Sequence, residues 1–131
     1  MTALSVINTP KAPKAIGPYS QAIQDGTHLF VSGQLPIDPS TGKIESSDIE
    51  GQSEQVFQNL KAILAEAGLD FTDVLRVDVF MTNLADFGLV NTLYAKQFNH
   101  ATPPARQTIE VSRLPLDALI EMSCIALLKK V

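Results

Sequence analysis

Two charged residues in the last quarter of the chain, Arg106 and Glu121, have the side-chain types best suited to chemistry. Glu121 interrupts the apolar run 119–128, where a carboxylate must be paired or have its pKa raised by desolvation. An arginine presents a planar fork of donors that matches a carboxylate, and an acid beside it can hold or deprotonate a water. If their strands are neighbours, the two side chains are predicted to share one site. A structural ion pair explains the pattern equally well.

Two short motifs could add ligand contacts. Gly17-Pro18 fixes a turn that would present Tyr19, and Ser32-Gly33 ends a predicted strand, where a ligand could approach the backbone. The pattern alone favours a packed tyrosine and a plain strand-to-turn transition. Cys124 lies in the apolar run and is expected to be packed rather than nucleophilic. No phosphate-binding, dinucleotide-binding or zinc-protease motif occurs in the sequence.

Hydrophobic periodicity predicts the elements that must position these residues. Residues 47–67 have helical spacing, with Ser47 and Glu50 as a capping box and Gly68 as the stop signal. A second helix is predicted over 84–99. The predicted strands are 4–7, 20–24, 28–32, 74–82, 105–112 and 118–128, with a hairpin turn at Asp25-Gly26 between the second and third.

The order of these elements, β-β-β-α-β-α-β-β, indicates an α+β fold with both helices on one face of a sheet. In the strand 74–82, the predicted apolar face consists of Leu75, Val77, Val79 and Met81. The run 119–128 is apolar on both faces, as in a strand that is covered on both sides. Because the helices cover only one side, we expect a neighbouring chain to cover the other.

Composition narrows the class of protein. The 131 residues form one predicted domain, residues 1–131, and 45% of them are hydrophobic. The net charge of −4 and the scattered Lys and Arg residues argue against nucleic acid as the main partner. The single cysteine excludes an intrachain disulfide and favours a reducing compartment. No apolar run approaches the roughly 18 residues of a membrane span, and residues 1–20 lack signal-peptide features, so we expect a cytoplasmic protein.

Five stretches form a specific pattern when they are taken together. They are IGPYSQAI (16–23), LFVSGQLPIDPSTGKI (29–44), PAR (104–106), EVSRLP (110–115) and IE (120–121). On these stretches the chain resembles the YjgF/RidA family of reactive-intermediate (2-iminobutanoate/2-iminopropanoate) deaminases. The resemblance implies a chorismate-mutase-like homotrimer with sites in the clefts between subunits. It also implies hydrolysis of enamines and imines, such as 2-aminoacrylate, to 2-keto acids and ammonia without a cofactor or a metal.

The resemblance also implies roles for residues already singled out. Arg106 matches the arginine that binds the substrate carboxylate, and Glu121 matches the acid that positions or activates the attacking water. Tyr19 matches the tyrosine that lines the cleft. Ser32 and Gly33 match the strand-end contacts.

Three further positions enter through the same resemblance. Asn91 corresponds to a helix residue near the site. Thr108 stands where many members carry a cysteine, so substrate preference or rate is expected to differ. Ser123 stands where many members carry a second acid, which leaves Glu121 as the only acid of its strand.

Two other activities compete with imine hydrolysis. One is an endoribonuclease or translation inhibitor, a name that some relatives carry, although the acidic charge and the absence of a histidine pair argue against it. The other is a regulatory module that binds keto acids in the same cleft without turnover.

Overall fold

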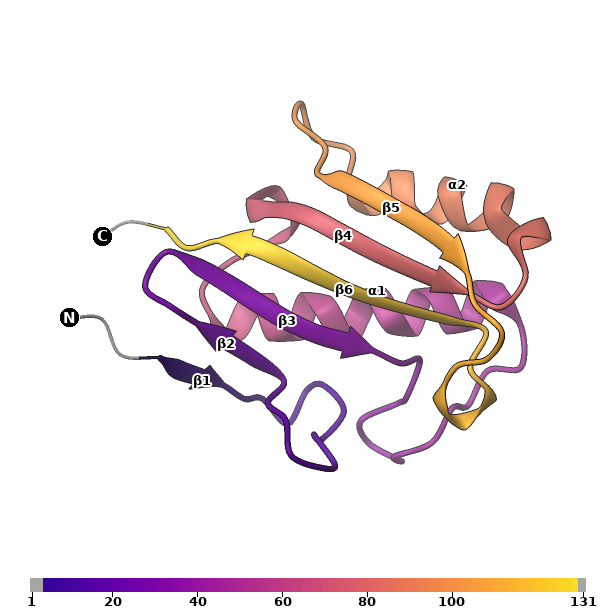
Figure 1. The fold of residues 1–131 in the computed structure, drawn as a ribbon, viewed down its shortest axis with the longest axis horizontal. Coiled ribbons are helices and arrows are strands. Elements are labelled where there is room, and N and C mark those ends of the chain that lie inside the picture. The colour runs from indigo at the N-terminus through magenta and orange to yellow at the C-terminus, as the bar shows by residue number, and fades with distance from the viewer. Residues whose placement is uncertain (1–3, 130–131) are drawn as a thin grey trace.

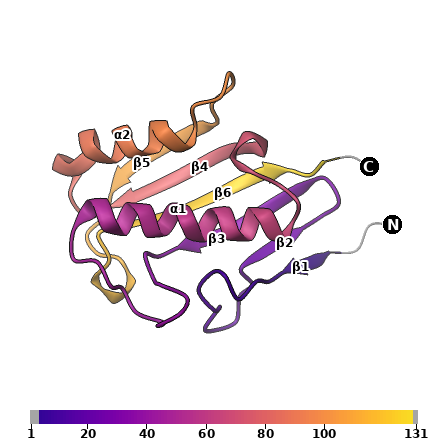
Figure 2. The same ribbon diagram turned by 180° about the vertical axis from the view of Figure 1, so that it is seen from behind.

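A mixed sheet of six strands carries two helices on one of its faces (Figures 1 and 2). The computed structural model describes residues 4–129. The strands are β1 Ser5–Ile7, β2 Ala22–Gln24, β3 His28–Gln34, β4 Val74–Met81, β5 Ala105–Glu110 and β6 Ile120–Leu127, and the helices are α1 Ile49–Glu66 and α2 Phe87–Gln97. Short 3-10 segments are Phe71–Asp73, Leu84–Asp86 and Pro115–Asp117. The predicted α+β class, element order and placement of both helices are confirmed.

Helix α1, Ile49–Glu66, lies within the predicted range 47–67, and the predicted stop signal at Gly68 is confirmed. Its N-cap is Asp48, whose carboxylate accepts from the Gly51 N–H at 2.7 Å, so the predicted capping box at Ser47 is wrong. At the other end, Gly68 has a φ of +75°, and the amide that follows it donates to the Leu64 carbonyl at 2.9 Å. This is the Schellman arrangement, in which a left-handed glycine satisfies the last carbonyls of a helix.

Strand β4 differs from its predicted alternation of buried and exposed residues at its first two positions. Leu75 is 44% exposed, whereas Val74 is buried. The cause is a bulge, because Val74 pairs with Ala126 while Arg76 pairs with Ile125, so one extra residue of β4 has no partner. The bulge shifts the alternation by one residue. The rest of the predicted apolar face is buried under the helices.

The strand order β1-β2-β3-β6-β4-β5 separates the two residues that the sequence placed on neighbouring strands. β4 lies between β5 and β6, so Arg106 and Glu121 are not on adjoining strands. Arg106 pairs with Val77 and shares its helix-covered face, whereas Glu121 pairs with Phe80 on the open face. The prediction that the two residues come from adjoining strands is therefore wrong, and within one chain they do not point into one site.

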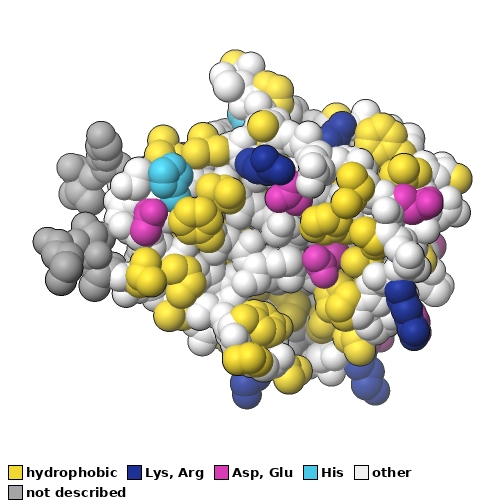
Figure 3. All heavy atoms as spheres, viewed as in Figure 1, with side chains coloured by type: hydrophobic (Ala, Val, Ile, Leu, Met, Phe, Trp, Pro, Cys, Tyr) yellow, Lys and Arg dark blue, Asp and Glu magenta, His cyan; other side chains and the backbone are white. Residues whose placement is uncertain are grey.

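The open face of the sheet carries a row of apolar side chains across four strands. Val6 pairs with Ile23, Ile23 with Phe30, and Phe30 with Ile125. We call these four residues the apolar row. Figure 3 shows hydrophobic side chains gathered on this face, which is the face seen in Figure 1. A neighbouring chain as the cover for this face stays a prediction.

Candidate functional site

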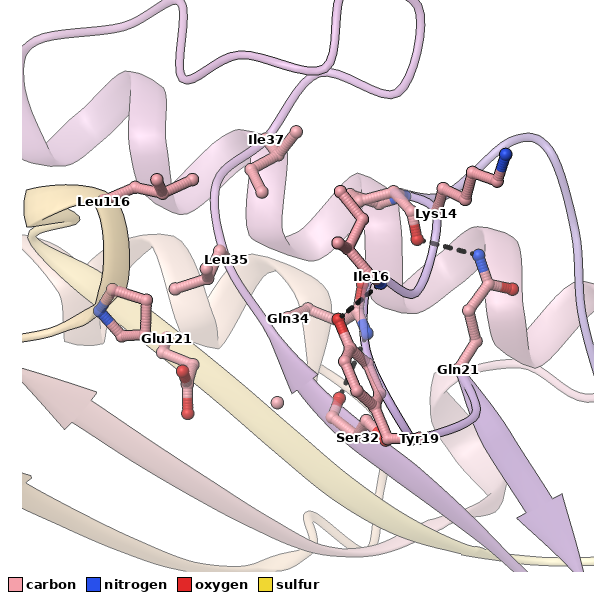
Figure 4. A pocket seen from close by; sticks show the side chains of 13 residues that line it. Lys14, Ile16, Tyr19, Gln21, Ser32, Gln34, Leu35, Ile37, Leu116 and Glu121 are labelled. Carbon is pink, nitrogen blue, oxygen red and sulfur yellow. Dashed lines mark hydrogen bonds between the residues drawn. The ribbon is translucent and has the colours of Figure 1, made fainter.

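A cavity of about 650 Å³ opens at the C-terminal end of β3 and contains Glu121 (Figure 4). We call it the Glu121 cavity. Its walls come from the loop before β2, the end of β3 and the loop after it, the Pro115–Asp117 segment and β6. The lining residues are Pro13, Lys14, Ile16, Tyr19, Gln21, Ser32, Gly33, Gln34, Leu35, Ile37, Pro115, Leu116 and Glu121. Four of the predicted site residues therefore share one cavity.

The end of β3 is shaped to receive the acid. The register between β3 and β6 shifts between Val31 and Gln34, which creates a bulge around Ser32 and Gly33. A Cβ atom on Gly33 would lie 2.6 Å from Glu121 Oε2, so only glycine leaves room for the carboxylate. Ser32 Oγ donates to the Ser20 carbonyl at 2.6 Å and can therefore only accept from a ligand.

Glu121 has no partner within the described part of the chain. It is half-buried, and no hydrogen bond or ion pair to it occurs among residues 4–129. Burial raises the pKa of the Glu121 carboxyl, because desolvation penalises the charged form. A carboxyl in this state can accept and return a proton near neutral pH more readily than an exposed one. The alternative of an intrachain ion pair with Arg106 is not realised.

Tyr19 lies over the cavity on a loop, and the buried side-chain amide of Gln21 anchors this loop. The Gln21 side chain accepts from the Thr9 N–H at 2.7 Å and donates to the Thr9 and Pro13 carbonyls at 3.0 and 2.9 Å. The Tyr19 hydroxyl accepts from the Ile16 N–H at 3.3 Å, which leaves its own proton free to be donated. The tyrosine is 53% exposed and lines the cavity, so it is not the packed core residue that the pattern alone favoured.

Arg106 lies on the helix side of the edge strand β5, against α2. Its Nη1 donates to Asn91 Oδ1 at 2.7 Å, and its guanidinium carbon is 4.7 Å from the centre of the Tyr94 ring and 5.4 Å from that of Phe87. We call these four residues the Arg106 shelf. The rings and the amide fix the plane of the guanidinium, and no residue from 4 to 129 uses its remaining donors. The exposed arginine can therefore bind a carboxylate.

Thr108 lies beside the Arg106 shelf and not in the Glu121 cavity. It lines a hollow of about 220 Å³ together with Leu84 and Phe87. Its Oγ1 atom is buried without a hydrogen-bond partner, as is the hydroxyl of Tyr94. Burial raises the pKa of Tyr94 to about 12, so this phenol stays protonated.

The predicted site residues thus form two groups in one chain. Tyr19, Ser32, Gly33 and Glu121 line the Glu121 cavity, whereas Arg106, Asn91 and Thr108 lie at the Arg106 shelf. Sequence reasoning did not assign Phe87, Tyr94, Ile16 or Leu116 to a site. Phe87, Asn91 and Tyr94 are spaced so that they share one helix face. This spacing indicates the Arg106 shelf only when Arg106 is known to lie opposite that face. Nothing in the residue types of Ile16 and Leu116 signals a cavity.

Neither a metal cluster nor a membrane segment occurs in the described part of the chain. No three His, Cys, Asp or Glu side chains between residues 4 and 129 gather closely enough to hold a metal ion. Within the same range, neither helix is both long and apolar enough to pass through a bilayer.

Comparison with known proteins assigns the family. Residues 9–128 match the family model described as Endoribonuclease L-PSP. A RutC family protein of Pyrococcus abyssi is 53% identical over 124 residues, which cover 95% of this chain and 97% of that protein. The chloroplastic Reactive Intermediate Deaminase A of Arabidopsis thaliana is 48% identical over 123 residues, or 94% of this chain and 65% of that protein. The chain belongs to the YjgF/RidA family.

Solved structures of YjgF/RidA proteins have the same fold. YyfA of Yersinia pestis, described as a Rid family protein of unknown function, has a TM-score of 0.92 at 47% identity and covers 95% of this chain and 98% of its own. TdcF of E. coli, solved with bound serine, has a TM-score of 0.90 at 41% identity, over 94% of this chain and 98% of its own. The family resemblance drawn from the sequence is thereby confirmed.

Proposed function

We propose that this YjgF/RidA protein hydrolyses 2-imino acids such as 2-iminopropanoate and 2-iminobutanoate to 2-keto acids and ammonia, at sites built by two protomers. The Glu121 cavity of one protomer would face the Arg106 shelf of the next. The observation that carries this proposal is the pair of unmatched charges. Glu121 has no partner among the described residues, and Arg106 keeps free donors on the other side of the same sheet.

Cyclic symmetry would explain why Arg106 and Glu121 are apart within one chain. In a ring of identical chains, each contact joins one surface to a different surface of the neighbour. An acid on the open face and a cation at the helix-side edge can then meet across every contact, although they cannot meet within one chain. The homotrimer that the family resemblance implies has this symmetry, and the apolar row offers a surface that a neighbour can cover.

The chemistry needs few groups because the substrate is already reactive. Arg106 binds the carboxylate through its fork and thereby orients the C=N carbon. Glu121, as the carboxylate, takes a proton from water while the water oxygen bonds to that carbon, and it passes this proton to the imine nitrogen, which gives a neutral carbinolamine. Glu121 then takes the hydroxyl proton of the carbinolamine and delivers it to the amine nitrogen, so the C=O bond forms while the C–N bond breaks and ammonia leaves. Each step conserves atoms and charge, with Glu121 restored at the end.

Two relatives support this assignment. The Arabidopsis relative is named a reactive intermediate deaminase. TdcF was solved with serine, an amino acid whose carboxylate adjoins the nitrogen-bearing carbon, as in a 2-imino acid. A site for a small α-substituted carboxylate in this chain agrees with both.

The first test generates the enamine in situ with a pyridoxal-phosphate dehydratase and follows the appearance of 2-keto acid. We expect wild type to accelerate it and Arg106→Lys to lose at least ~90% of the effect, because an ammonium cannot make the two parallel bonds of a guanidinium. Arg113→Lys is the matched control, since Arg113 is largely exposed and pairs only with Asp117. Equal rates for Arg106→Lys and wild type would show that the assigned role is wrong.

A mixing experiment tests the shared site. Arg106→Ala and Glu121→Gln are each expected to be inactive alone. When the two variants are refolded together in equal amounts, random mixing in a ring places an intact acid next to an intact arginine at about a quarter of the contacts. We therefore expect about 25% of wild-type activity to return. No recovery, in mixed oligomers of normal mass, would contradict a site built by two protomers.

The same preparations decide between the competing functions. Keto-acid binding without an effect on imine decay would favour a regulatory module. RNA cleavage that disappears in Arg106→Ala would favour the endoribonuclease named by the family model. The net charge of −4 opposes RNA binding, because affinity for a polyanion depends on neutralising phosphates with Lys and Arg.

A further inference from the structure

The Pro115–Asp117 segment holds a leucine in an unfavourable backbone conformation. Leu116 has a φ of 58° and a ψ of 24°, and Asp117 has a φ of 54°. L-residues other than glycine, asparagine and aspartate rarely occupy this left-handed region, because the Cβ atom crowds the following carbonyl. Leu116 is also 66% exposed, so the chain itself offers little packing to offset the strain. Strain that persists without local compensation often marks a functional position.

Leu116 lines the Glu121 cavity. Figure 4 shows it on the side of the cavity opposite Ile16, and Glu121 lies below Leu116 in this view. Ile16 is 83% exposed, and its position is fixed by the hydrogen bond from its amide to Tyr19. Two exposed aliphatic side chains therefore flank the entrance to a half-buried acid.

The one cationic side chain among the lining residues does not alter this character. Lys14 extends away from Glu121 (Figure 4), so it leaves the entrance between Ile16 and Leu116 apolar. A charged or strongly polar group placed between these two side chains would lose hydration without gaining a partner. An alkyl group in the same place would bury apolar surface.

We propose that Leu116 is a specificity-determining residue of the Glu121 cavity, whose left-handed backbone presents the isobutyl group to the alkyl side chain of the substrate. Leu116 would then make the cavity prefer an ethyl over a methyl side chain. This inference rests on the proposed function and adds to it the residue that sets the side-chain preference. The rival explanation is that a neighbouring protomer covers Leu116 and uses it only for packing.

Glycine substitutions separate the two explanations. Leu116→Gly removes both the strain and the isobutyl group. Asp117→Gly is the matched control, because it also places glycine at a left-handed residue, lies outside the cavity lining and loses only an exposed ion pair with Arg113. At one fixed protein concentration, we expect Leu116→Gly to raise the unfolding midpoint by about 2–5 °C, and Asp117→Gly to change it less because aspartate tolerates this conformation.

Only Leu116→Gly should change specificity. We expect its ratio of kcat/KM for 2-iminobutanoate over 2-iminopropanoate to fall by about threefold to tenfold, the effect of losing a partly buried methylene contact. The affinity ratio for 2-ketobutyrate over pyruvate should fall in parallel. Unchanged ratios in Leu116→Gly would overturn the proposal. A midpoint that falls in Leu116→Gly but not in Asp117→Gly would overturn it in favour of packing against a neighbour.

Imine hydrolysis and keto-acid affinity, measured on wild type, distinguish a failure of this inference from a failure of the proposed function. If wild type binds 2-ketobutyrate more tightly than pyruvate but hydrolyses no imine, the deaminase proposal fails and the role of Leu116 stands. If wild type hydrolyses both imines at equal kcat/KM and binds both keto acids equally, the deaminase proposal stands and the role of Leu116 is wrong. If wild type neither binds nor turns over these compounds, both are overturned.

Discussion

Under the proposed function, the acid–base chemistry depends on Glu121, whose carboxyl has no partner among residues 4–129. Burial disfavours the charged form of this carboxyl. The carboxyl packs against Gly33, where a Cβ atom would occupy its place. A surface carboxylate would titrate near its ordinary value and be solvated. The burial of Glu121 is therefore the residue-scale property that its proposed role as a proton acceptor and donor needs.

The pH dependence of the reaction should report Glu121. The carboxylate form is the one that accepts a proton from water, so kcat/KM should fall as pH drops through its pKa. Because burial raises that pKa, the acid limb should lie above the ordinary value of 4.5. Glu121→Gln should lose the limb together with most of the activity. A limb below 4.5 in the wild-type pH–rate profile would instead indicate a direct ion pair with Arg106 of the neighbour.

Gly33→Ala tests the space reserved for the carboxylate. The added methyl would lie 2.6 Å from Glu121 Oε2, so the acid must move. We expect kcat/KM to fall at least ~10-fold with the fold retained, because displacement of a reacting group by about 1 Å is costly. The control is Gly88→Ala, since nothing lies within 4 Å of a Cβ at that position in α2. Wild-type activity in Gly33→Ala would show that the position of the carboxylate is not critical.

At the scale of elements, features fixed by local contacts were predictable from the sequence. The end of α1 at Gly68 is one example, because the glycine and the hydrogen bonds that satisfy the last turn lie within a few residues. The hairpin between β2 and β3 is another, with Gly26 at a φ of 95°. The bulge at Leu75 was not predictable, because it depends on the register against β6, about 50 residues later in the chain.

The site was predictable in its residue types and not in its geometry. The sequence signalled Arg106 and Glu121, but their placement depends on strand order. β4, α2 and β5 form a strand-helix-strand crossover, which favours parallel pairing of β4 with β5. The rule leaves β6 free to pair with the outer edge of β5 or with the other edge of β4, and in the structure it pairs with β4. The crossover rule alone therefore does not separate Arg106 from Glu121.

The loop that carries Tyr19 depends on the buried amide of Gln21. Gln21→Ala would leave the backbone groups of Thr9 and Pro13 without their partners. We expect the free energy of unfolding to fall by about 2–3 kcal/mol and kcat/KM to fall with it, because Tyr19 loses its support. Denaturant titration measures the first effect. Gln58→Ala, at an exposed position of α1, is the control and should stay within about 0.5 kcal/mol of wild type.

At the scale of the whole molecule, the open face of the sheet needs an explanation that one chain does not provide. Helices cover only the other face (Figure 2), and the apolar row crosses four strands without a cover within the described residues. A contiguous apolar surface of this kind is typical of an interface. The proposed two-protomer site gives the same surface a second purpose, because covering it would also bring the two charges together.

Phe30→Asp should therefore disrupt both assembly and activity. Phe30 is at the middle of the apolar row and is 44% exposed. Light scattering should give about three times the 14.2 kDa chain mass for wild type and a single chain mass for the variant. Leu89→Asp on α2 is the control, since Leu89 is 43% exposed in the single chain. A wild-type monomer, or an active monomeric Phe30→Asp, would contradict the proposal.

The separation of Arg106 and Glu121 by a single sheet has a consequence for the newly made protein. If the proposed two-protomer site is correct, a single chain would carry both residues without being able to use them, and catalysis would begin only when identical chains assemble. An open linear assembly would have an unmatched Glu121 at one end and an unmatched Arg106 at the other. Closure into a ring would bring these two residues together in one more site. The concentration of the protein would then determine the fraction of chains that are assembled and active, in addition to the total number of chains.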